Sequence, residues 1–284
     1  MSSLILLAET GSDITPAIAA RYGIRMVPMH VTFDTETRDD GTFPPEEIRD
    51  YYRRTGKLPT TSGSTPEDFA RVFDAIHAED PEAQILYLAY SAVTTCSYQS
   101  AVIAAEGRDY ITMVDTKQVS VGQCAAVVAV AKLLEQNPGM SVSEAAKAAE
   151  EISGRVQMGF LPENLEFLKA GGRVSNAAYL GSRILSLHPC IEILDGKLMA
   201  TKKYRGKMEK VTLELVEDYA EKYALDRDLL WFIYTVDLPE AILDRAEERA
   251  KALGFREIRR VRANGVITTH GGPGAFGVAG YKKA

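Results

Sequence analysis

Cysteine and long apolar runs are both scarce in this sequence. The three cysteines, Cys96, Cys124 and Cys190, lie far apart in 284 residues and form no C-x-x-C pair. This spacing indicates neither a disulfide framework nor a thiolate metal site. The first apolar run, residues 4–8, lacks a basic flank and is too short for a signal peptide, and no run approaches the length of a membrane span. We therefore expect a cytoplasmic protein with no integral membrane segment.

Positive charge is scarce as well. The chain has 33 Lys and Arg against 39 Asp and Glu, a formal net charge of −6, and no basic block. This balance argues against a nucleic-acid partner. His30, His77 and His188 show no metal-ligand spacing, and there is no G-x-x-x-x-G-K-[ST] loop for a nucleotide. The sequence therefore predicts no metal site and no cofactor.

What the first half does contain is a repeated alternation of strands and helices. Helices are predicted after the capping residues Thr15, Thr65 and Ser141, the first two followed by Pro and the last by Glu144 in a capping box. Polar segments at 34–41 and 58–66 predict loops. Strands are predicted at 4–8, 26–33, 85–89 and 111–114. Such alternation is typical of a parallel sheet with helices on both faces.

The second half predicts a different sheet. Asp195-Gly196 is a strong two-residue hairpin turn between strands at 190–194 and 197–204, and a helix is predicted from Ser175. Further helices and strands are predicted at 207–222, 230–235, 239–253 and 257–262. We therefore expect an α/β fold with two domains, 1–156 with a parallel sheet and 157–284 with a mixed sheet.

A glycine-rich segment near the end of the chain follows a β-branched run, Val266 to Thr269, and His270. Gly272 to Gly277 spells G-x-G-x-x-G, but only residues 278–284 remain after it, and they contain no acidic residue. A dinucleotide fingerprint needs a following helix and an acidic residue about 20 positions later. The glycines are better explained by tight turns and close backbone approach.

Hydroxyl side chains gather in two loops that adjoin predicted strands or helices. The loop 58–66 contains Thr61 and Ser62, which helix capping does not explain, and the loop 90–96 contains Thr95. A strand-to-helix turn at the carboxyl edge of an open α/β sheet is where ligands bind. These loops are therefore candidates for a binding site.

Six segments together resemble the DegV family, whose members include the fatty-acid-binding subunits of bacterial fatty acid kinase. The resemblance spans nearly the whole chain, and the order and spacing of the segments make it specific. The segments are 9–13 (ETGSD), 61–66 (TSGSTP), 97–101 (SYQSA), 168–175 (LKAGGRVS), 195–207 (DG and KYRGK) and 269–275 (THGGPGA).

The resemblance implies two α/β domains with an acyl chain buried between or within them. It implies that the carboxylate of a long-chain fatty acid is held by Thr61, Thr95 and His270, with Ser62 and Gly271 in the same ligand-binding site. The chain differs from the usual family pattern at Thr95-Cys96, where Ser-Gly is common, and at Gly63-Ser64, where Gln-Pro is common.

The family's function implies a substrate carrier with no catalytic residues, not an enzyme. Its partner would be the separate catalytic subunit of a fatty acid kinase, which would phosphorylate the bound acid for phospholipid synthesis. Arg173, Lys203 and Arg205 lie in two basic motifs and are the candidates for docking that subunit or its phosphates. A transient contact with a membrane surface is a further partner that the sequence leaves open.

Two other functions remain open on sequence grounds. One is a hydrolase or acyltransferase with Thr95 or Ser97 as nucleophile, His270 as base and Asp115 orienting it, although no G-x-S-x-G elbow is present. The other is a lipid sensor or carrier with no kinase partner.

Overall fold

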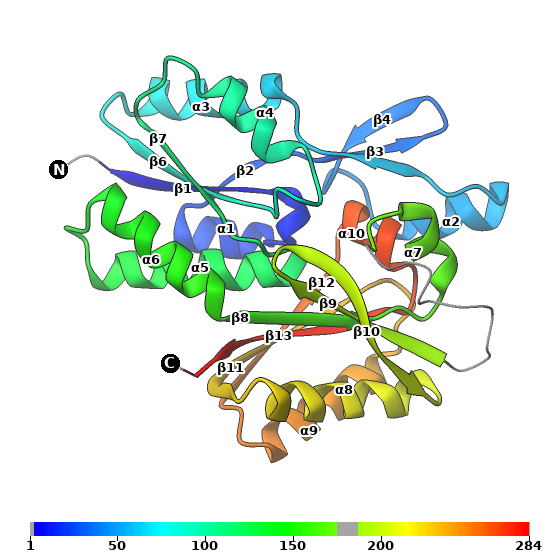
Figure 1. Cartoon of the computed structure of the whole chain (residues 1–284). Coiled ribbons are helices and arrows are strands. Elements are labelled where there is room, and N and C mark those ends of the chain that lie inside the picture. The colour runs from blue at the N-terminus through cyan, green and yellow to red at the C-terminus, as the bar shows by residue number, and fades with distance from the viewer. Residues whose placement is uncertain (1–2, 175–186, 284) are drawn as a thin grey trace.

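A computed structural model describes residues 3–174 and 187–283 of the chain. It contains a four-stranded, a six-stranded and a small three-stranded sheet, and Figure 1 shows the first two as separate layers with helices between and outside them. The α/β fold class, with a parallel sheet in the first half and a mixed sheet in the second, is confirmed. The helix predicted from Ser175 lies outside the described residues.

The four-stranded sheet is entirely parallel and has the order β2-β1-β6-β7. Thr15, Thr65 and Ser141 accept hydrogen bonds at the starts of three of its helices, as predicted, and the last two form capping boxes. Helices α3 and α4 cover one face, and α1, α5 and α6 the other (Figure 1). The elements are β1 (Leu4–Glu9), η1 (Thr10–Ser12), α1 (Pro16–Tyr22), β2 (Arg25–Val27), α3 (Pro66–Glu79), β6 (Gln84–Ala89), α4 (Ser97–Ala104), β7 (Ile111–Asp115), α5 (Ser120–Gln136) and α6 (Val142–Arg155).

The small sheet was not predicted. The expected strand 26–33 is two strands, because Pro28 has no N–H to continue a ladder, and its second part pairs elsewhere. The segments 34–41 and 58–66, predicted as loops, each contribute a short strand. The sheet has the order β4-β3-β5, and one helix lies between β4 and β5 in the chain. The elements are β3 (His30–Phe33), β4 (Glu36–Asp39), α2 (Glu46–Thr55) and β5 (Thr60–Ser62).

The six-stranded sheet is mixed and has the order β10-β9-β8-β13-β11-β12. The pairing of β11 with β12 is parallel, and the other four are antiparallel. Asp195 and Gly196 have φ of 47° and 79°, as a type I′ turn requires, so the predicted hairpin is confirmed. The elements are β8 (Val156–Leu161), α7 (Leu165–Gly171), β9 (Leu187–Leu194), β10 (Lys197–Arg205), α8 (Met208–Lys222), β11 (Leu225–Tyr234), α9 (Glu240–Ala252), β12 (Glu257–Arg262), α10 (Gly265–Gly271) and β13 (Phe276–Lys282).

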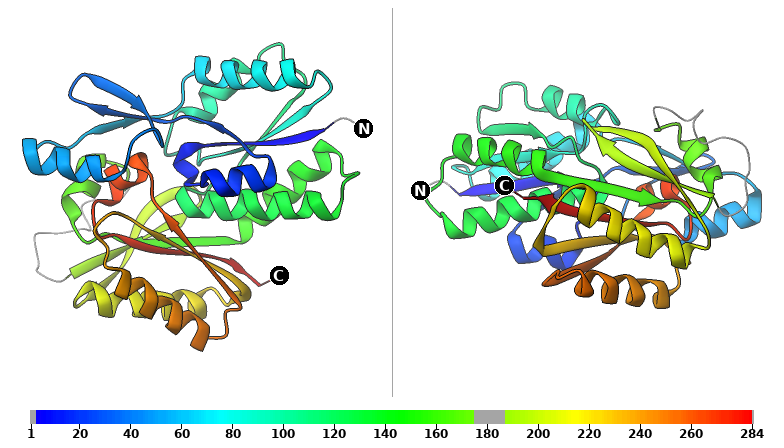
Figure 2. Two further views of the ribbon diagram at one scale, coloured as in Figure 1. Left: turned by 180° about the vertical axis from the view of Figure 1, so that it is seen from behind. Right: turned by 60° about the horizontal axis from the view of Figure 1, so that its bottom comes forward.

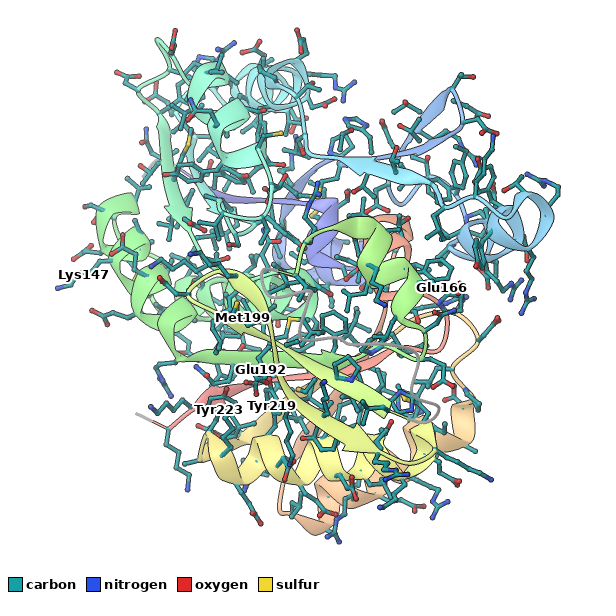
Figure 3. All side chains as sticks on the ribbon, turned by 45° about the vertical axis from the view of Figure 1, so that its right-hand side comes forward. Lys147, Glu166, Glu192, Met199, Tyr219 and Tyr223 are labelled. Carbon is teal, nitrogen blue, oxygen red and sulfur yellow. The ribbon has the colours of Figure 1, made fainter. Side chains whose placement is uncertain are left out.

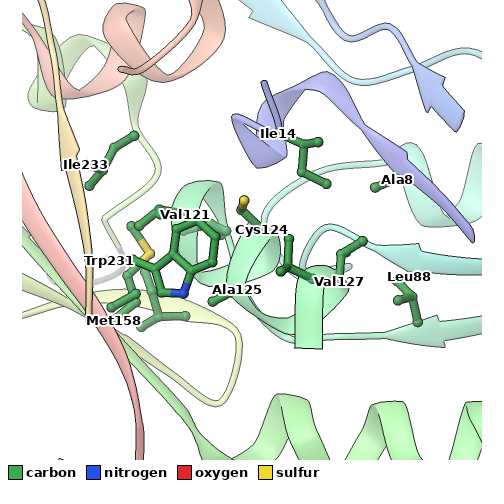
Figure 4. Close-up of a cluster of buried hydrophobic side chains, with 14 of the residues drawn as sticks. Ala8, Ile14, Leu88, Val121, Cys124, Ala125, Val127, Met158, Trp231 and Ile233 are labelled. Carbon is green, nitrogen blue, oxygen red and sulfur yellow. The ribbon is translucent and has the colours of Figure 1, made fainter. Parts of the chain in front are cut away.

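Helix α5 joins the two large sheets into one core. Seen from behind, it lies between them (Figure 2). Its buried Val121 and Cys124 lie between Trp231 of β11 on one side and Ala8 and Leu88 of the parallel sheet on the other (Figure 4). Burial of this apolar helix stabilises both halves at once, so the two sheets are held in a fixed relation.

The outer face of the six-stranded sheet is covered by α8 and α9. Glu192 of β9 is buried, and both its oxygens lie 2.8 Å from the Lys222 ammonium of α8. Tyr219 packs so closely on Gly159 that a Cβ there would lie 1.9 Å from its hydroxyl. Figure 3 shows Glu192, Tyr219 and Tyr223 together in this layer. It lies on the opposite side of the sheet from the site described next.

Candidate ligand-binding site

The topology of the parallel sheet creates a crevice at the ends of β1 and β6. From β1 the chain moves to β2 on one side, whereas β6 pairs with β1 on the other side. The loops after β1 and β6 therefore diverge, and ligands bind at such switch points in open α/β sheets. The inner face of the six-stranded sheet lies opposite these loops.

A cavity lies between the two halves at this crevice. It contains about 830 Å³ of space between atoms, including its opening to solvent. Most of its wall is apolar. Apolar side chains from both halves line it, among them Met29, Val119, Met158, Phe160, Leu198 and Ile233.

The residues predicted to bind the ligand all line this cavity: Thr61, Ser62, Thr95, His270 and Gly271. The β-branched run before His270 forms α10, which brings the histidine to β5. Nε2 of His270 lies 2.8 Å from Oγ1 of Thr61. The structure thus places a hydroxyl and an imidazole from opposite ends of the chain in one hydrogen bond.

His270 is neutral in this environment. Burial, together with a smaller contribution from the positive charge of Arg173, lowers the pKa of His270 to about 4. Among the described residues, Nδ1 has no hydrogen-bond partner, and it packs on Gly171, where a Cβ would lie 2.2 Å away. We therefore assign the proton to Nε2, which donates to Thr61 and leaves the threonine hydroxyl hydrogen free to point into the cavity.

Thr95 belongs to a second group of hydroxyls. Its Oγ1 lies 3.1 Å from Oγ of Ser97, which accepts a hydrogen bond of 3.0 Å from the backbone N–H of Ser64. Gly63 permits this approach, because a Cβ there would lie 2.5 Å from Oγ1 of Thr95. The two hydroxyl loops are therefore interlocked, which explains why glycine occupies this position.

The three basic residues predicted to dock a partner do not lie together at the cavity. Arg173 is exposed, lines the cavity and donates a 3.0 Å hydrogen bond to the carbonyl of Gly171. Lys203 and Arg205 are exposed near the end of β10, outside the residues that line the cavity. Their role in docking stays a prediction.

Two buried carboxylates that the sequence did not single out border the same site. Burial raises the pKa of Asp13 to about 8 and that of Asp40 to about 6. Asp13 accepts a 2.6 Å hydrogen bond from Ser120, a further cavity residue. Ser120 has φ of 46°, a strained conformation that is common at functional sites. Asp13 appeared in the sequence only as part of a family motif, and Asp40 carried no signal.

The geometry does not support a catalytic triad. Oδ1 of Asp115 accepts hydrogen bonds from the backbone N–H groups of Ala92 and Lys117 and so fixes its own turn. Within the part of the chain that the structure describes, Nδ1 of His270 has no acceptor. Within residues 3–174 and 187–283, no three His, Cys, Asp or Glu side chains are grouped to hold a metal ion. In the same ranges, no helix combines the length and apolarity that a membrane span requires.

Comparison with known proteins identifies the family. Residues 4–283 match the model of a family described as "Uncharacterised protein, DegV family". The chain belongs to the DegV family. The resemblance drawn from the six sequence segments is thereby confirmed.

Relatives of this DegV protein match it over almost their whole length. A DegV domain-containing protein from Deinococcus radiodurans is 29% identical, with 98% of each chain covered. A protein named fatty acid-binding protein from Thermotoga maritima is 27% identical, with 96% of this chain and 95% of the relative covered. A solved DegV family protein from Thermus thermophilus, described by its fatty acid binding, is 28% identical with a TM-score of 0.88 and covers 99% of this chain and 100% of its own.

Proposed function

We propose that this protein binds one long-chain fatty acid in the cavity and presents its carboxylate to a separate, ATP-dependent fatty acid kinase. The observation that carries the proposal is the hydrogen-bonded pair of Thr61 and His270 in a cavity whose wall is otherwise largely apolar. Thr95, Ser62 and Gly271 complete the head-group site. The relatives named for fatty acid binding support the same ligand class.

The energetics favour an acyl chain over a small polar ligand. Burial yields about 0.8 kcal/mol per methylene, so a sixteen-carbon chain gains roughly 11 kcal/mol. An unpaired buried carboxylate would oppose this by several kcal/mol. The hydroxyl hydrogens of Thr61 and Thr95 can offset that cost, because both side chains line the cavity.

The choice of neutral donors suits a carboxylate that must later react. A bidentate arginine would hold both oxygens and reduce their nucleophilicity, whereas hydroxyl donors orient the group and leave it available for phosphoryl transfer. The protein would then act in the cytoplasm as a carrier and not as the catalyst. Arg173, which is exposed at the cavity, would contact the kinase or its phosphates, with Lys203 and Arg205 as further contacts.

Native mass spectrometry of the purified protein tests the lipid part of this proposal. We expect one fatty acid per chain, exchangeable with added long-chain fatty acid, and a lower occupancy in His270→Ala. A chain that carries no lipid and does not bind added fatty acid in calorimetry would refute fatty acid binding. Time-dependent labelling by a serine-reactive phosphonate would instead favour a hydrolase.

The kinase part needs a second measurement. With a fatty acid kinase catalytic subunit and ATP, the loaded protein should yield acyl phosphate, and Arg173→Ala should lower that yield while lipid occupancy is kept. Arg21→Ala is a matched control, since Arg21 is an exposed arginine on α1 paired with Glu135. Failure to form acyl phosphate with normal lipid binding would favour a sensor or carrier without a kinase, and loss of lipid in Arg173→Ala would assign that residue to the pocket.

A further inference from the structure

The start of α10 is anchored by carboxylates from the other half of the molecule. Helix α10 has only seven residues, four of them β-branched, and Asn264 provides no side-chain cap. Its first N–H groups have no partner within the helix, and β-branched residues favour helix weakly. The segment therefore depends on outside acceptors to be helical and to hold His270 at its last turn.

Asp13 supplies the first acceptor. Its Oδ1 accepts a 2.8 Å hydrogen bond from the backbone N–H of Asn264, 251 positions away, and its Oδ2 accepts from Ser120 at the start of α5. One buried carboxylate thus ties the start of α10 to the helix that joins the two sheets.

Asp40 supplies the second acceptor. Its Oδ1 accepts a 3.0 Å hydrogen bond from the backbone N–H of Val266, 226 positions away. The backbone N–H of Asp40 is itself fixed by a 2.7 Å hydrogen bond to the carbonyl of Met29. Gly265 allows the close approach, because a Cβ there would lie 2.5 Å from the Phe43 ring and 3.1 Å from Oδ1 of Asp40.

The position of Asp40 connects the strand that carries Thr61 with the helix that carries His270. Asp40 directly follows β4, and β4 and β5 pair with the two edges of β3. β5 carries Thr61. The small sheet therefore provides Thr61 directly and, through Asp40, the anchor of the helix that carries His270.

We propose that Asp40 and Asp13 are positioning residues that hold α10 so that His270 meets Thr61 at the carboxylate of the ligand. This inference rests on the proposed fatty acid binding. According to this inference, two buried acids control how well the site distinguishes a carboxylate from an uncharged head group. Neither acid needs to touch the ligand.

The test compares palmitic acid with its methyl ester, which has the same tail and no charge. Affinities are measured by calorimetry for wild type, Asp40→Ala, Asp40→Asn and Asp13→Ala. In Asp40→Ala we expect the preference for the acid over the ester to fall about tenfold, with little change for the ester. Asp40→Asn should recover most of it, because the amide oxygen can still accept from Val266. Asp34→Ala, at an exposed carboxylate in the β3–β4 turn, is the control.

A double-mutant cycle separates positioning from simple loss of stability. If Asp40 acts through His270, Asp40→Ala should not reduce the preference further in a His270→Ala background. An equal loss for acid and ester, or an unchanged preference in folded Asp40→Ala, would overturn the proposal. Wild-type protein that binds neither compound would instead refute the proposed function.

A measurement without ligand keeps the inference testable in that case too. NMR titration of His270 in the unliganded protein should give the lowered pKa in wild type and a pKa closer to that of a free histidine in Asp40→Ala, since a displaced ring regains water, whereas Asp40→Asn should keep the pKa lowered. An identical titration in wild type and Asp40→Ala would show that Asp40 does not position His270.

Discussion

Oγ1 of Thr61 and Nε2 of His270 lie 2.8 Å apart although 209 positions separate them in the chain. Thr61 is on β5 of the small sheet, and His270 is on α10, between two strands of the six-stranded sheet. The proposed head-group site therefore exists only when the two halves are docked. Helix α5 and the carboxylates of Asp13 and Asp40 maintain that docking.

The first prediction concerns the hydroxyl of Thr61. Thr61→Val keeps the shape of the side chain and removes its donor, so we expect fatty acid affinity to fall about tenfold, the value of roughly one hydrogen bond to a charged group. Thr61→Ser should restore it. Displacement of a fluorescent fatty acid measures both. Thr60→Val, at the exposed neighbour on the same strand, is the control, and equal affinities for the Thr60 and Thr61 variants would contradict the assigned role.

The second prediction concerns the glycine behind the histidine. In Gly171→Ala the new Cβ would lie 2.2 Å from Nδ1 of His270, so the ring must leave the position in which it bonds Thr61. We expect a loss of about 1–3 kcal/mol in stability together with weaker binding of the acid. Gly154→Ala is a matched control, since Gly154 also lies in the last turn of a helix and its Cβ would meet nothing within 4 Å. There, Ala should be neutral or stabilising by up to about 1 kcal/mol. Thermal melts measure the stability of both variants, and fatty acid titration measures their affinity. If Gly171→Ala had the same stability and affinity as Gly154→Ala, His270 would have room to adapt to the new Cβ.

Local chemistry explains why much of the fold was predictable. Thr65 and Ser141 are followed three positions later by Asp68 and Glu144, and each pair forms a complete capping box. Asp195-Gly196 can adopt positive φ at two successive positions, and the hairpin follows from that. In these segments the interactions that determine the local structure lie within a few residues of one another. The local sequence is therefore enough to predict the helix starts and the hairpin.

Long-range contacts explain the elements that the sequence did not predict. The run from Val266 to Thr269 has the composition of a strand, yet it is helical. At its start Asp13 and Asp40, more than 200 positions away, accept hydrogen bonds from the backbone N–H groups of Asn264 and Val266. The strand β5 is only three residues long and owes its existence to pairing with β3. Neither partner can be recognised from the local sequence.

In the candidate site, too, some features follow from the local sequence and others depend on long-range contacts. Thr61, Thr95 and His270 were predicted from family motifs, and all three line one cavity. Their separation could not be predicted, because it depends on how two sheets pack across α5. Asp40 could not be found at all, since an acidic residue after a charged turn looks like an ordinary surface residue until the fold buries it.

The third prediction concerns the acyl tail. Leu198 of β10 is buried and lines the cavity, so Leu198→Trp should fill space that a long tail needs. We expect affinity for a sixteen-carbon acid to fall at least about tenfold, while an eight-carbon acid binds with little change, because each excluded methylene forfeits about 0.8 kcal/mol. Leu198→Met, which nearly conserves volume, is the control. Calorimetry with both acids measures the effect, and an equal loss for the short acid would show that Leu198 lies near the head group and not along the tail.

The last prediction concerns pH and the buried carboxyl of Asp13. Its pKa is raised from about 3.8 to about 8 in the folded protein, so between these values the folded state binds one proton more than the unfolded state. The contribution of this carboxyl to stability is therefore fully present below about pH 4 and is lost as pH rises through about 8, at about 1.4 kcal/mol per pH unit in between. Asp13→Asn cannot titrate and should gain stability relative to wild type as pH rises from 5 to 8. Urea unfolding at several pH values measures the difference, with Asp34→Asn as control, since the pKa of Asp34 is lowered and its contribution is constant over this range. Parallel stability curves for wild type and Asp13→Asn between pH 5 and 8 would show that Asp13 is ionised throughout and that burial does not raise its pKa.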